Sequence, residues 1–201
     1  VSPPNGKTRS LTCGALGVTG GWNPHIHLTS HHRGRPVWKD DIAAFCPPID
    51  GPAGLSVAGA ALGSFTTTGA LLSGAKQATE ALEELGFKTE SAVLPEAEGT
   101  ITKMTPFWYV EGCTRAWLDQ QNDVTVKDVK LSHQENFVSV EHLKRYTTLG
   151  MATDQGKTSN MGGLAIMAEL TGKTIPQVGT TIFRPPYTPT AIGAFAGRDR
   201  D

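Results

Sequence analysis

The stretch that decides the fold is residues 117–160, which read WLDQQNDVTVKDVKLSHQENFVSVEHLKRYTTLGMATDQGKTSN. Within it, Thr125 precedes Asp128 by three residues, a spacing that resembles a capping box. This pair predicts a helix that opens at Thr125 and runs to about Glu135. A capping residue contributes about 1 kcal/mol, which matters in a helix this short.

Two more helices are expected after the first. Ser139 can cap a second helix that ends at Gly150, and Asn160 can cap a third that ends at Gly172. Glycine suits both ends because it adopts a positive φ without strain. Residues 113–172 are therefore predicted to form a compact helical domain.

The same stretch resembles the bacterioferritin-associated-ferredoxin-like domain, a small helical domain that holds a [2Fe-2S] cluster. In that domain a Cys-x-Cys pair precedes a Val-Thr helix start, a Leu-Lys-Arg-x-Thr helix follows, and two more cysteines surround a Gln-Gly pair. The residues of this frame present here are Val124, Thr125, Leu143, Lys144, Arg145, Thr147, Gly150, Met151, Gln155 and Gly156. The resemblance places the four ligand positions at Asp119, Gln121, Asp154 and Ser159. Because such clusters need thiolate ligands, we expect no iron–sulfur cluster and no metal here.

Four segments together resemble one family, the α subunit of heterotetrameric sarcosine oxidase and relatives such as N-methylglutamate dehydrogenase. In chain order they read VTGGWNPHIHL, SVAGAALGSF, SVEHLKRYTTLGMATDQGKTSN and GTTIFRPPYTP. The resemblance covers nearly the whole chain. In this family the α subunit combines a dinucleotide-binding region, the cysteine-free helical domain and a folate-binding aminomethyltransferase domain.

The resemblance implies a fragment of such a subunit with an α+β fold. Residues 1–90 would be the C-terminal part of a Rossmann-like dinucleotide-binding domain of the FAD/NAD type, and residues 91–112 a linker. Residues 113–172 would be the ferredoxin-like helical domain without its cluster. Residues 173–201, which contain several prolines, would extend toward the missing folate-binding domain.

The function implied is oxidative demethylation of sarcosine or a similar N-methyl amino acid by a multi-subunit flavoenzyme. Its products would be glycine with formaldehyde or methylene-tetrahydrofolate. The resemblance implies NAD in the α subunit, FMN at the subunit interface, FAD in a partner subunit and tetrahydrofolate in the missing domain. The partners would be a β subunit, which oxidises the small-molecule amine, and smaller subunits. The fragment alone is expected to be inactive, and it contains no predicted catalytic residue.

Two alternatives stay open. The first is the α subunit of a related amino-acid or opine dehydrogenase, although most of those keep the cluster cysteines that are replaced here. The second is a non-catalytic module that only bridges subunits. A flavin absorbance spectrum in a copurified complex would favour the enzyme.

Composition excludes some other classes. The formal net charge of −1 argues against a nucleic-acid partner. No apolar stretch is long enough to span a bilayer, and the first residues do not read as a basic-then-apolar signal sequence. Together with the resemblance, these features lead us to expect no membrane partner and a cytoplasmic protein. Three widely spaced cysteines predict buried free thiols in a reducing compartment.

The first half of the chain predicts short elements. Residues 10–21 and 55–59 read as buried strands, residues 37–38 and 42–45 as short elements, and residues 107–110 as a strand within the linker. A helix capped by Thr67 or Thr68 should run to about Leu85, before Gly86. Its apolar stripe comprises Leu71, Ala75, Ala78 and Leu82.

The first candidate site is the predicted turn between strand 55–59 and that helix. Such a turn of small residues can bring backbone N–H groups to a nucleotide. By resemblance, the residues in contact with a dinucleotide would be Gly59, Ala60, Gly63, Ser64, Phe65, Thr66 and Thr67. The alternative is that small residues simply allow close packing between the strand and the helix.

The second candidate site is the loop before Asn160. A P-loop is excluded, because a Walker A sequence has four residues between its glycines and five separate Gly150 from Gly156. The loop still offers polar donors that could approach the phosphate or ring of flavin mononucleotide: Arg145, Thr148, Lys157, Thr158 and Asn160. The alternative is that Asp154 and Ser159 only close the loop by hydrogen bonds.

The histidines suggest a weaker candidate site. His25, His27, His31 and His32 could ligate zinc, but no cysteine or carboxylate lies at matching spacing. An ordinary loop after Asn23-Pro24 is the favoured interpretation.

Overall fold

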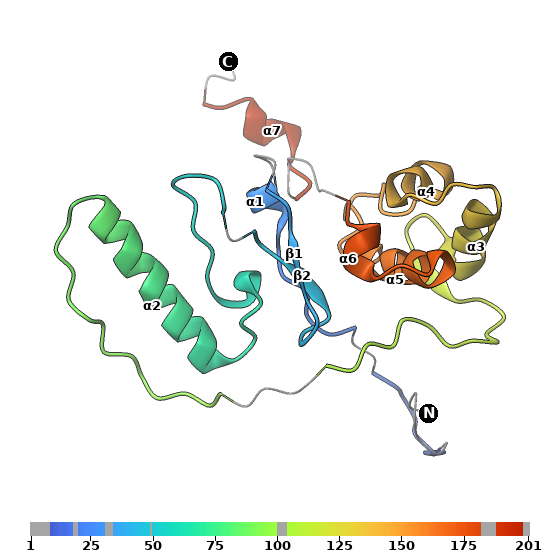
Figure 1. Ribbon diagram of the computed structural model, residues 1–201, viewed down its shortest axis with the longest axis horizontal. Helices are drawn as coiled ribbons and strands as arrows, with labels where there is room; N and C mark the ends of the chain where they lie inside the picture. Colours follow the sequence, from blue (N-terminus) through green and yellow to red (C-terminus); the bar gives the residue numbers. More distant parts are fainter. Residues whose placement is uncertain are drawn as a thin grey trace.

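The computed structural model describes residues 9–17, 20–30, 34–48, 50–99, 104–181 and 188–198. Helices and two small antiparallel sheets alternate along the chain, which confirms the α+β class. The elements are α1 (His27–Ser30), β1 (Val37–Lys39), β2 (Ala44–Cys46), the 3-10 helix η1 (Gly59–Leu62), α2 (Thr67–Glu84), β3 (Trp117–Asp119), β4 (Val124–Thr125), α3 (Val126–Gln134), α4 (Val140–Thr147), α5 (Asn160–Thr171), α6 (Ile175–Val178) and α7 (Ile192–Phe195). Figure 1 shows α3 to α6 grouped together, with α2 at the opposite end of the molecule and the β1–β2 hairpin between them.

The capping box predicted at the start of α3 is confirmed. The Thr125 backbone N–H donates to Asp128 Oδ2 at 2.7 Å, and both halves of the box are present. The sequence did not reveal the hairpin before it, in which β3 pairs antiparallel with β4. The turn of this hairpin holds Asp123 at a positive φ of 54°, a conformation that Asp tolerates better than most residues.

The next two helices differ from the prediction at their ends. Ser139 caps α4 by accepting a hydrogen bond from the His142 N–H at 3.2 Å, as predicted. The helix ends at Thr147, before the predicted Gly150, because Thr148 turns left-handed with φ 63°. The N-cap position of α5 is Ser159, so Asn160 is the first helical residue and not the cap, whereas the end at Gly172 is confirmed.

The hydrophobic core draws on both halves of the sequence. The least exposed members are Val129, Leu143, Ile166 and Met167, from α3, α4 and α5. Ile26 and Phe45, from the first half of the chain, belong to the same cluster. The β1–β2 hairpin and the segment before α1 are therefore packed onto the helical unit, which brings residues far apart in sequence to one place.

The first half contains fewer strands than predicted. Residues 37–38 and 44–45 do lie in the hairpin, where Trp38 pairs with Phe45, and their rings are 5.1 Å apart. The strands predicted within 10–21, at 55–59 and at 107–110 are wrong wherever the structure describes those residues, which are irregular or begin η1. These segments satisfy an apolar strand pattern, but among the described residues no strand pairs with them.

Helix α2 has the predicted length and a well-formed end. Thr66, one residue earlier than predicted, caps it by accepting from the Gly69 N–H at 3.0 Å. At its end the Gly86 N–H donates to Glu83 and the Phe87 N–H to Leu82, the Schellman pattern of a glycine-terminated helix. No residue of α2 is fully buried in this chain, so its apolar stripe is only partly covered: Leu71 and Ala75 are half-buried and Leu82 is 43% exposed.

The segment after residue 173 is not extended throughout. Thr174 and Gln177 form a second capping box, and Pro176 lies in the first turn of α6, where its missing N–H costs nothing. α7 follows the residues outside the described ranges. Proline therefore starts a helix here, where the sequence suggested an extended chain.

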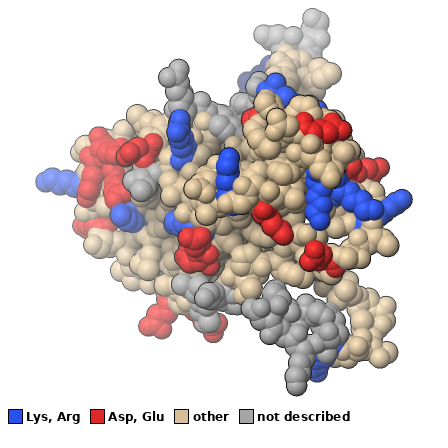
Figure 2. All heavy atoms as spheres, turned by 45° about the vertical axis from the view of Figure 1, so that its right-hand side comes forward, with Lys and Arg blue, Asp and Glu red and all other residues tan. Residues whose placement is uncertain are grey.

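Two observations concern the predictions about membrane and nucleic-acid partners. In the described part of the chain, none of the helices combines the length and the apolar character needed to cross a membrane. Acidic and basic side chains are interspersed over the face shown in Figure 2, which lacks one broad basic region.

Candidate functional site

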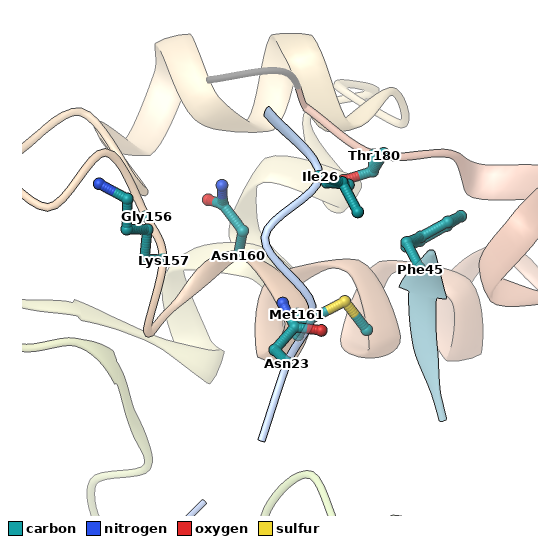
Figure 3. Close-up of a pocket in the computed structure, with 8 residues that line it drawn as sticks. All are labelled: Asn23, Ile26, Phe45, Gly156, Lys157, Asn160, Met161 and Thr180. Atoms are coloured by element: carbon teal, nitrogen blue, oxygen red, sulfur yellow. The ribbon is translucent and has the colours of Figure 1, made fainter. Parts of the chain in front are cut away.

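An open pocket lies where the two halves of the chain meet. Its enclosed volume is about 20 Å³, and the figure rises to about 300 Å³ when the open solvent at its mouth is included. Figure 3 shows that its lining residues come from segments far apart in the sequence. The lining residues are Asn23 and Ile26 from the segment before α1, Phe45 from β2, Gly156 and Lys157 from the loop before α5, Asn160 and Met161 from α5, and Thr180 from the segment after α6.

Local hydrogen bonds fix the wall of the pocket formed by the first half. The Ile26 carbonyl accepts from Thr29 Oγ1 at 2.7 Å and from Ser30 Oγ at 2.8 Å. Both hydroxyls are buried. This arrangement stabilises the turn into α1 and holds Ile26 beside Phe45 in the shared core.

The opposite wall is the N-terminus of α5, a helix of 12 residues. Helix N-termini favour anions because their first N–H groups point outward and the helix dipole is positive there. Lys157 lies two residues before the N-cap and adds a cation to the same wall. Ser159 Oγ is buried and has no hydrogen-bond partner among the described residues, and a buried hydroxyl in that state calls for an additional polar group.

Asn160 is enclosed by the loop that it follows. Its Nδ2 donates to Thr181 Oγ1 at 3.0 Å and to the Gln155 carbonyl at 3.5 Å. A Cβ added to Gly150 or to Gly156 would approach Asn160 Oδ1 to 2.2 Å. Both glycines also have a positive φ, so the loop closes around this one amide.

Asp119, the first of the four positions that the resemblance matches to cluster ligands, binds backbone N–H groups. It is 3% exposed. Oδ1 accepts from Gln121 N at 2.9 Å and Asn122 N at 3.1 Å, and Oδ2 accepts from Gly150 N at 2.8 Å. The carboxylate therefore joins the β3–β4 turn to the loop, at a position where the resembling domain has a thiolate.

Gln121 and Asp154, the next two of these matched positions, also form hydrogen bonds. Gln121 Oε1 accepts from Thr153 Oγ1 at 3.0 Å. Asp154 accepts from the Gly156 N–H at 3.1 Å and from Thr158 Oγ1 at 2.9 Å. The sequence left open that Asp154 and Ser159 close the loop before α5 by hydrogen bonds. This is confirmed for the Asp154 side chain but not for the Ser159 side chain.

The predicted flavin donors therefore separate into two groups. Lys157 and Asn160 line the pocket. Thr158 donates to Asp154, and Thr148, at the end of α4, donates its hydroxyl to the Thr147 carbonyl. Thr148 and Thr158 are exposed and lie outside the lining, as does Arg145, which pairs with Glu141 at 3.7 Å. Asn23, Ile26, Phe45, Met161 and Thr180 were not predicted as site residues, because only the tertiary fold brings them together.

The turn proposed for a dinucleotide is used largely for internal contacts. The Gly59 N–H donates to Ser73 Oγ at 2.9 Å, and the N–H groups of Gly63 and Ser64 donate to carbonyls of η1. Thr66 caps α2. Ala60 and Thr67 are exposed, and Phe65 packs against a small cluster around β2.

Gly63 shows why small residues are needed in that turn. Its φ is 86°, and an added Cβ would lie 2.7 Å from Cys46 Sγ and 2.9 Å from Ile42 Cδ1. This close approach supports the alternative that the glycines serve packing. Burial raises the pKa of the Cys46 thiol, which keeps it protonated and unreactive.

No metal centre is formed by the described residues, where His, Cys, Asp and Glu side chains do not gather in groups of three. The rings of His25 and His27 meet at right angles, 5.6 Å apart, while His31 and His32 lie outside the described ranges. All three cysteines are free thiols, as predicted. The prediction that they are buried is confirmed for Cys46 alone, because Cys13 and Cys113 are exposed.

We predict that anaerobic reconstitution with iron and sulfide leaves this chain colourless. The thiolates that such clusters need are replaced at all four matched positions, where Asp119, Gln121 and Asp154 already carry protein hydrogen bonds. Absorbance at visible wavelengths measures the outcome. A variant with cysteine at all four positions is the matched comparison, and a stoichiometric cluster in the unaltered chain would contradict the prediction.

This chain is similar in sequence to proteins of one family. The model of the sarcosine oxidase A3 domain matches residues 113–198. The α subunit of sarcosine oxidase from Rhizobium meliloti (strain 1021) is 42% identical over 195 residues, which are 96% of this chain and 20% of that protein. The corresponding subunit from Corynebacterium sp. (strain P-1) is 37% identical over 204 residues, 97% of this chain and 21% of that protein.

A solved structure supports the fold. The crystal structure of L-proline dehydrogenase from P. horikoshii superimposes with a TM-score of 0.64 at 20% identity, over 85% of this chain and 37% of that one. At this identity the likeness concerns the fold alone. The chain spans about a fifth of the length of the curated relatives it matches. Residues 113–198 match the A3 domain, and over nearly its whole length the chain belongs to the sarcosine oxidase α-subunit family.

Proposed function

We propose that this chain is part of the α subunit of a multi-subunit flavoenzyme that oxidatively demethylates sarcosine or a similar N-methyl amino acid. The observation that carries the proposal is the pocket at the N-terminus of α5, with Lys157 and Asn160 in its lining. In this proposal the pocket and its rim contact flavin mononucleotide at the interface with the β subunit.

The chemistry of the pocket fits the phosphate of that cofactor. A dianionic phosphate is stabilised by a helix N-terminus and by a nearby ammonium group, and the α5 wall offers both. The Thr180 and Asn23 side chains add polar groups at the mouth, and Ile26, Phe45 and Met161 form an apolar side. Bound flavin supplies the electron-accepting chemistry, while the residues of this chain hold and orient it. Thr148 and Thr158 are exposed and lie outside the lining, and they are assigned to contacts made when the partner subunit is bound.

The remaining assignments follow from the family. Residues 1–90 are proposed to complete a Rossmann-like, NAD-binding domain, and residues 113–172 to be a ferredoxin-like helical domain without a cluster, joined by the linker 91–112. Residues 173–201 lead toward a domain for tetrahydrofolate. FAD is assigned to a partner subunit, smaller subunits complete the complex, and the location is the cytoplasm.

The residues present do not form a dinucleotide cradle by themselves. The N–H groups of Gly59, Gly63 and Ser64 donate within the chain, so they are not available to a pyrophosphate. Contacts from the turn Gly59–Thr67 would come from its exposed side, at Ala60 and Thr67. The proposal therefore assigns no chemical step to NAD in this segment.

Lys157→Met tests the phosphate contact in the assembled complex. Losing a charge-assisted hydrogen bond costs about 1.5–3 kcal/mol, so we expect the flavin mononucleotide concentration for half-occupancy to rise by about 10- to 100-fold. The measurement is flavin absorbance per complex assembled over a range of cofactor concentrations. Lys173→Met, which removes an exposed lysine outside the pocket lining, is the matched control. Equal occupancy in both variants would contradict the proposal.

A further inference from the structure

Asn160 has contacts that differ from those of a simple cofactor ligand. It is 8% exposed, and its Nδ2 donates to two protein groups, Thr181 Oγ1 and the Gln155 carbonyl. Its Oδ1 lies over the Cα atoms of Gly150 and Gly156, where a Cβ on either would come within 2.2 Å. The Asn160 amide group therefore contacts other groups of the protein, although the residue lines the pocket.

These contacts join three segments that are separate in sequence. The loop that carries Lys157 closes around the amide through its two glycines, and α5 supplies the residue itself. The third segment follows α6 and is held by the buried hydroxyl of Thr181, which is 5% exposed. Thr180 in that segment lines the pocket, whereas Thr181 does not.

We infer that Asn160 is a positioning residue: it holds the segment of Thr180 through Thr181, and the loop of Lys157 through the Gln155 carbonyl and the two glycines. The inference rests on the proposed function of the pocket and assigns Asn160 an indirect role in it. Because Thr181 is outside the lining, a change there acts on a bound cofactor indirectly, through its neighbour Thr180 or through Asn160 and the loop of Lys157. Pre-positioned polar groups bind more tightly because less order is lost on binding.

Thr181→Val is the informative variant, since valine keeps the shape of threonine and removes the hydroxyl that accepts from Asn160. Thr181→Ser restores the hydroxyl. The matched control is Thr171→Val, which removes from the far end of α5 a hydroxyl that donates to the Met167 carbonyl at 2.7 Å. The three variants separate the contact with Asn160 from the general effect of removing a hydroxyl near this helix.

Two measurements test the inference. In this chain alone, amide hydrogen exchange at Gly156 and Lys157 is expected to become faster in Thr181→Val, and to stay at the original rate in Thr181→Ser and Thr171→Val. In the assembled complex, Thr181→Val should raise the flavin mononucleotide concentration for half-occupancy by about 2- to 10-fold, the range that corresponds to one net hydrogen bond. The melting temperature of Thr181→Val should match that of Thr171→Val.

The outcomes distinguish this inference from the proposed function. Unchanged exchange in Thr181→Val would overturn the inference. Unchanged occupancy in Thr181→Val, together with weakened binding in Lys157→Met, would overturn the inference and leave the proposed function intact. If Lys157→Met binds flavin normally, the proposed function fails, and faster exchange in Thr181→Val still supports the link between the segments.

Discussion

Asp119→Asn is expected to lower the free energy of unfolding by about 2–3 kcal/mol, the scale of a hydrogen bond to a charged group. The carboxylate is 3% exposed and accepts from three backbone N–H groups. An asparagine can keep one oxygen toward the β3–β4 turn, but its NH₂ group would then face the Gly150 N–H, so that two donors oppose each other. Urea unfolding at neutral pH measures the change.

The neighbouring Asp123→Asn is the matched control for this prediction. Asp123 is exposed and lies in the same turn with a φ of 54°, a conformation that asparagine also tolerates. We expect the free energy of unfolding of Asp123→Asn to stay within about 0.5 kcal/mol of that of the original chain. If both variants lose the same free energy of unfolding, the loss comes from removing a carboxylate charge in this turn. The hydrogen bond from the Gly150 N–H to Asp119 would then contribute nothing to stability.

Gly156→Ala should destabilise the chain by about 3 kcal/mol through two effects. The φ of 75° costs a non-glycine residue about 1–2 kcal/mol. The new Cβ would also lie within 2.2 to 2.5 Å of three atoms of the Asn160 amide, and such overpacking typically costs about 1–3 kcal/mol. Thermal unfolding followed by circular dichroism measures the loss.

Gly172→Ala separates the two effects. Gly172 ends α5 with a φ of 64°, and an added Cβ would meet nothing within 4 Å. This variant should show the backbone cost alone, about 1–2 kcal/mol. If Gly156→Ala is no more harmful than Gly172→Ala, the loop can shift away from Asn160 and the tight closure described here is wrong.

Local signals predicted the parts of the fold that depend on neighbours in sequence. The capping box at Thr125, the cap at Ser139 and the end of α5 at Gly172 each involve side chains or backbone groups within a few residues. Helix α2 was predicted for the same reason. The boundaries that failed depend on competition between adjacent residues: Thr148 turns left-handed before Gly150 is reached, and Ser159 takes the cap position next to Asn160.

Long-range contacts were beyond what the sequence pattern could show. The strands expected at 10–21 and 55–59 satisfied a local apolar pattern, but a strand forms only where a partner pairs with it. The pocket depends on Ile26 and Phe45 packing against the helical unit, and nothing in their spacing indicates that contact. Lys157 and Asn160 were found because they belong to the segment that resembles the family, whereas the engagement of the Asn160 amide is visible only in three dimensions.

The most direct test of the proposed cofactor contact is a cryo-electron microscopy structure of the complete oxidase complex with flavin mononucleotide bound. We expect the cofactor phosphate at the N-terminus of α5, within hydrogen-bonding distance of Lys157 Nζ, with the Asn160 side chain still hydrogen-bonded to Thr181. A flavin phosphate bound elsewhere, with this pocket filled by another protein segment, would contradict it.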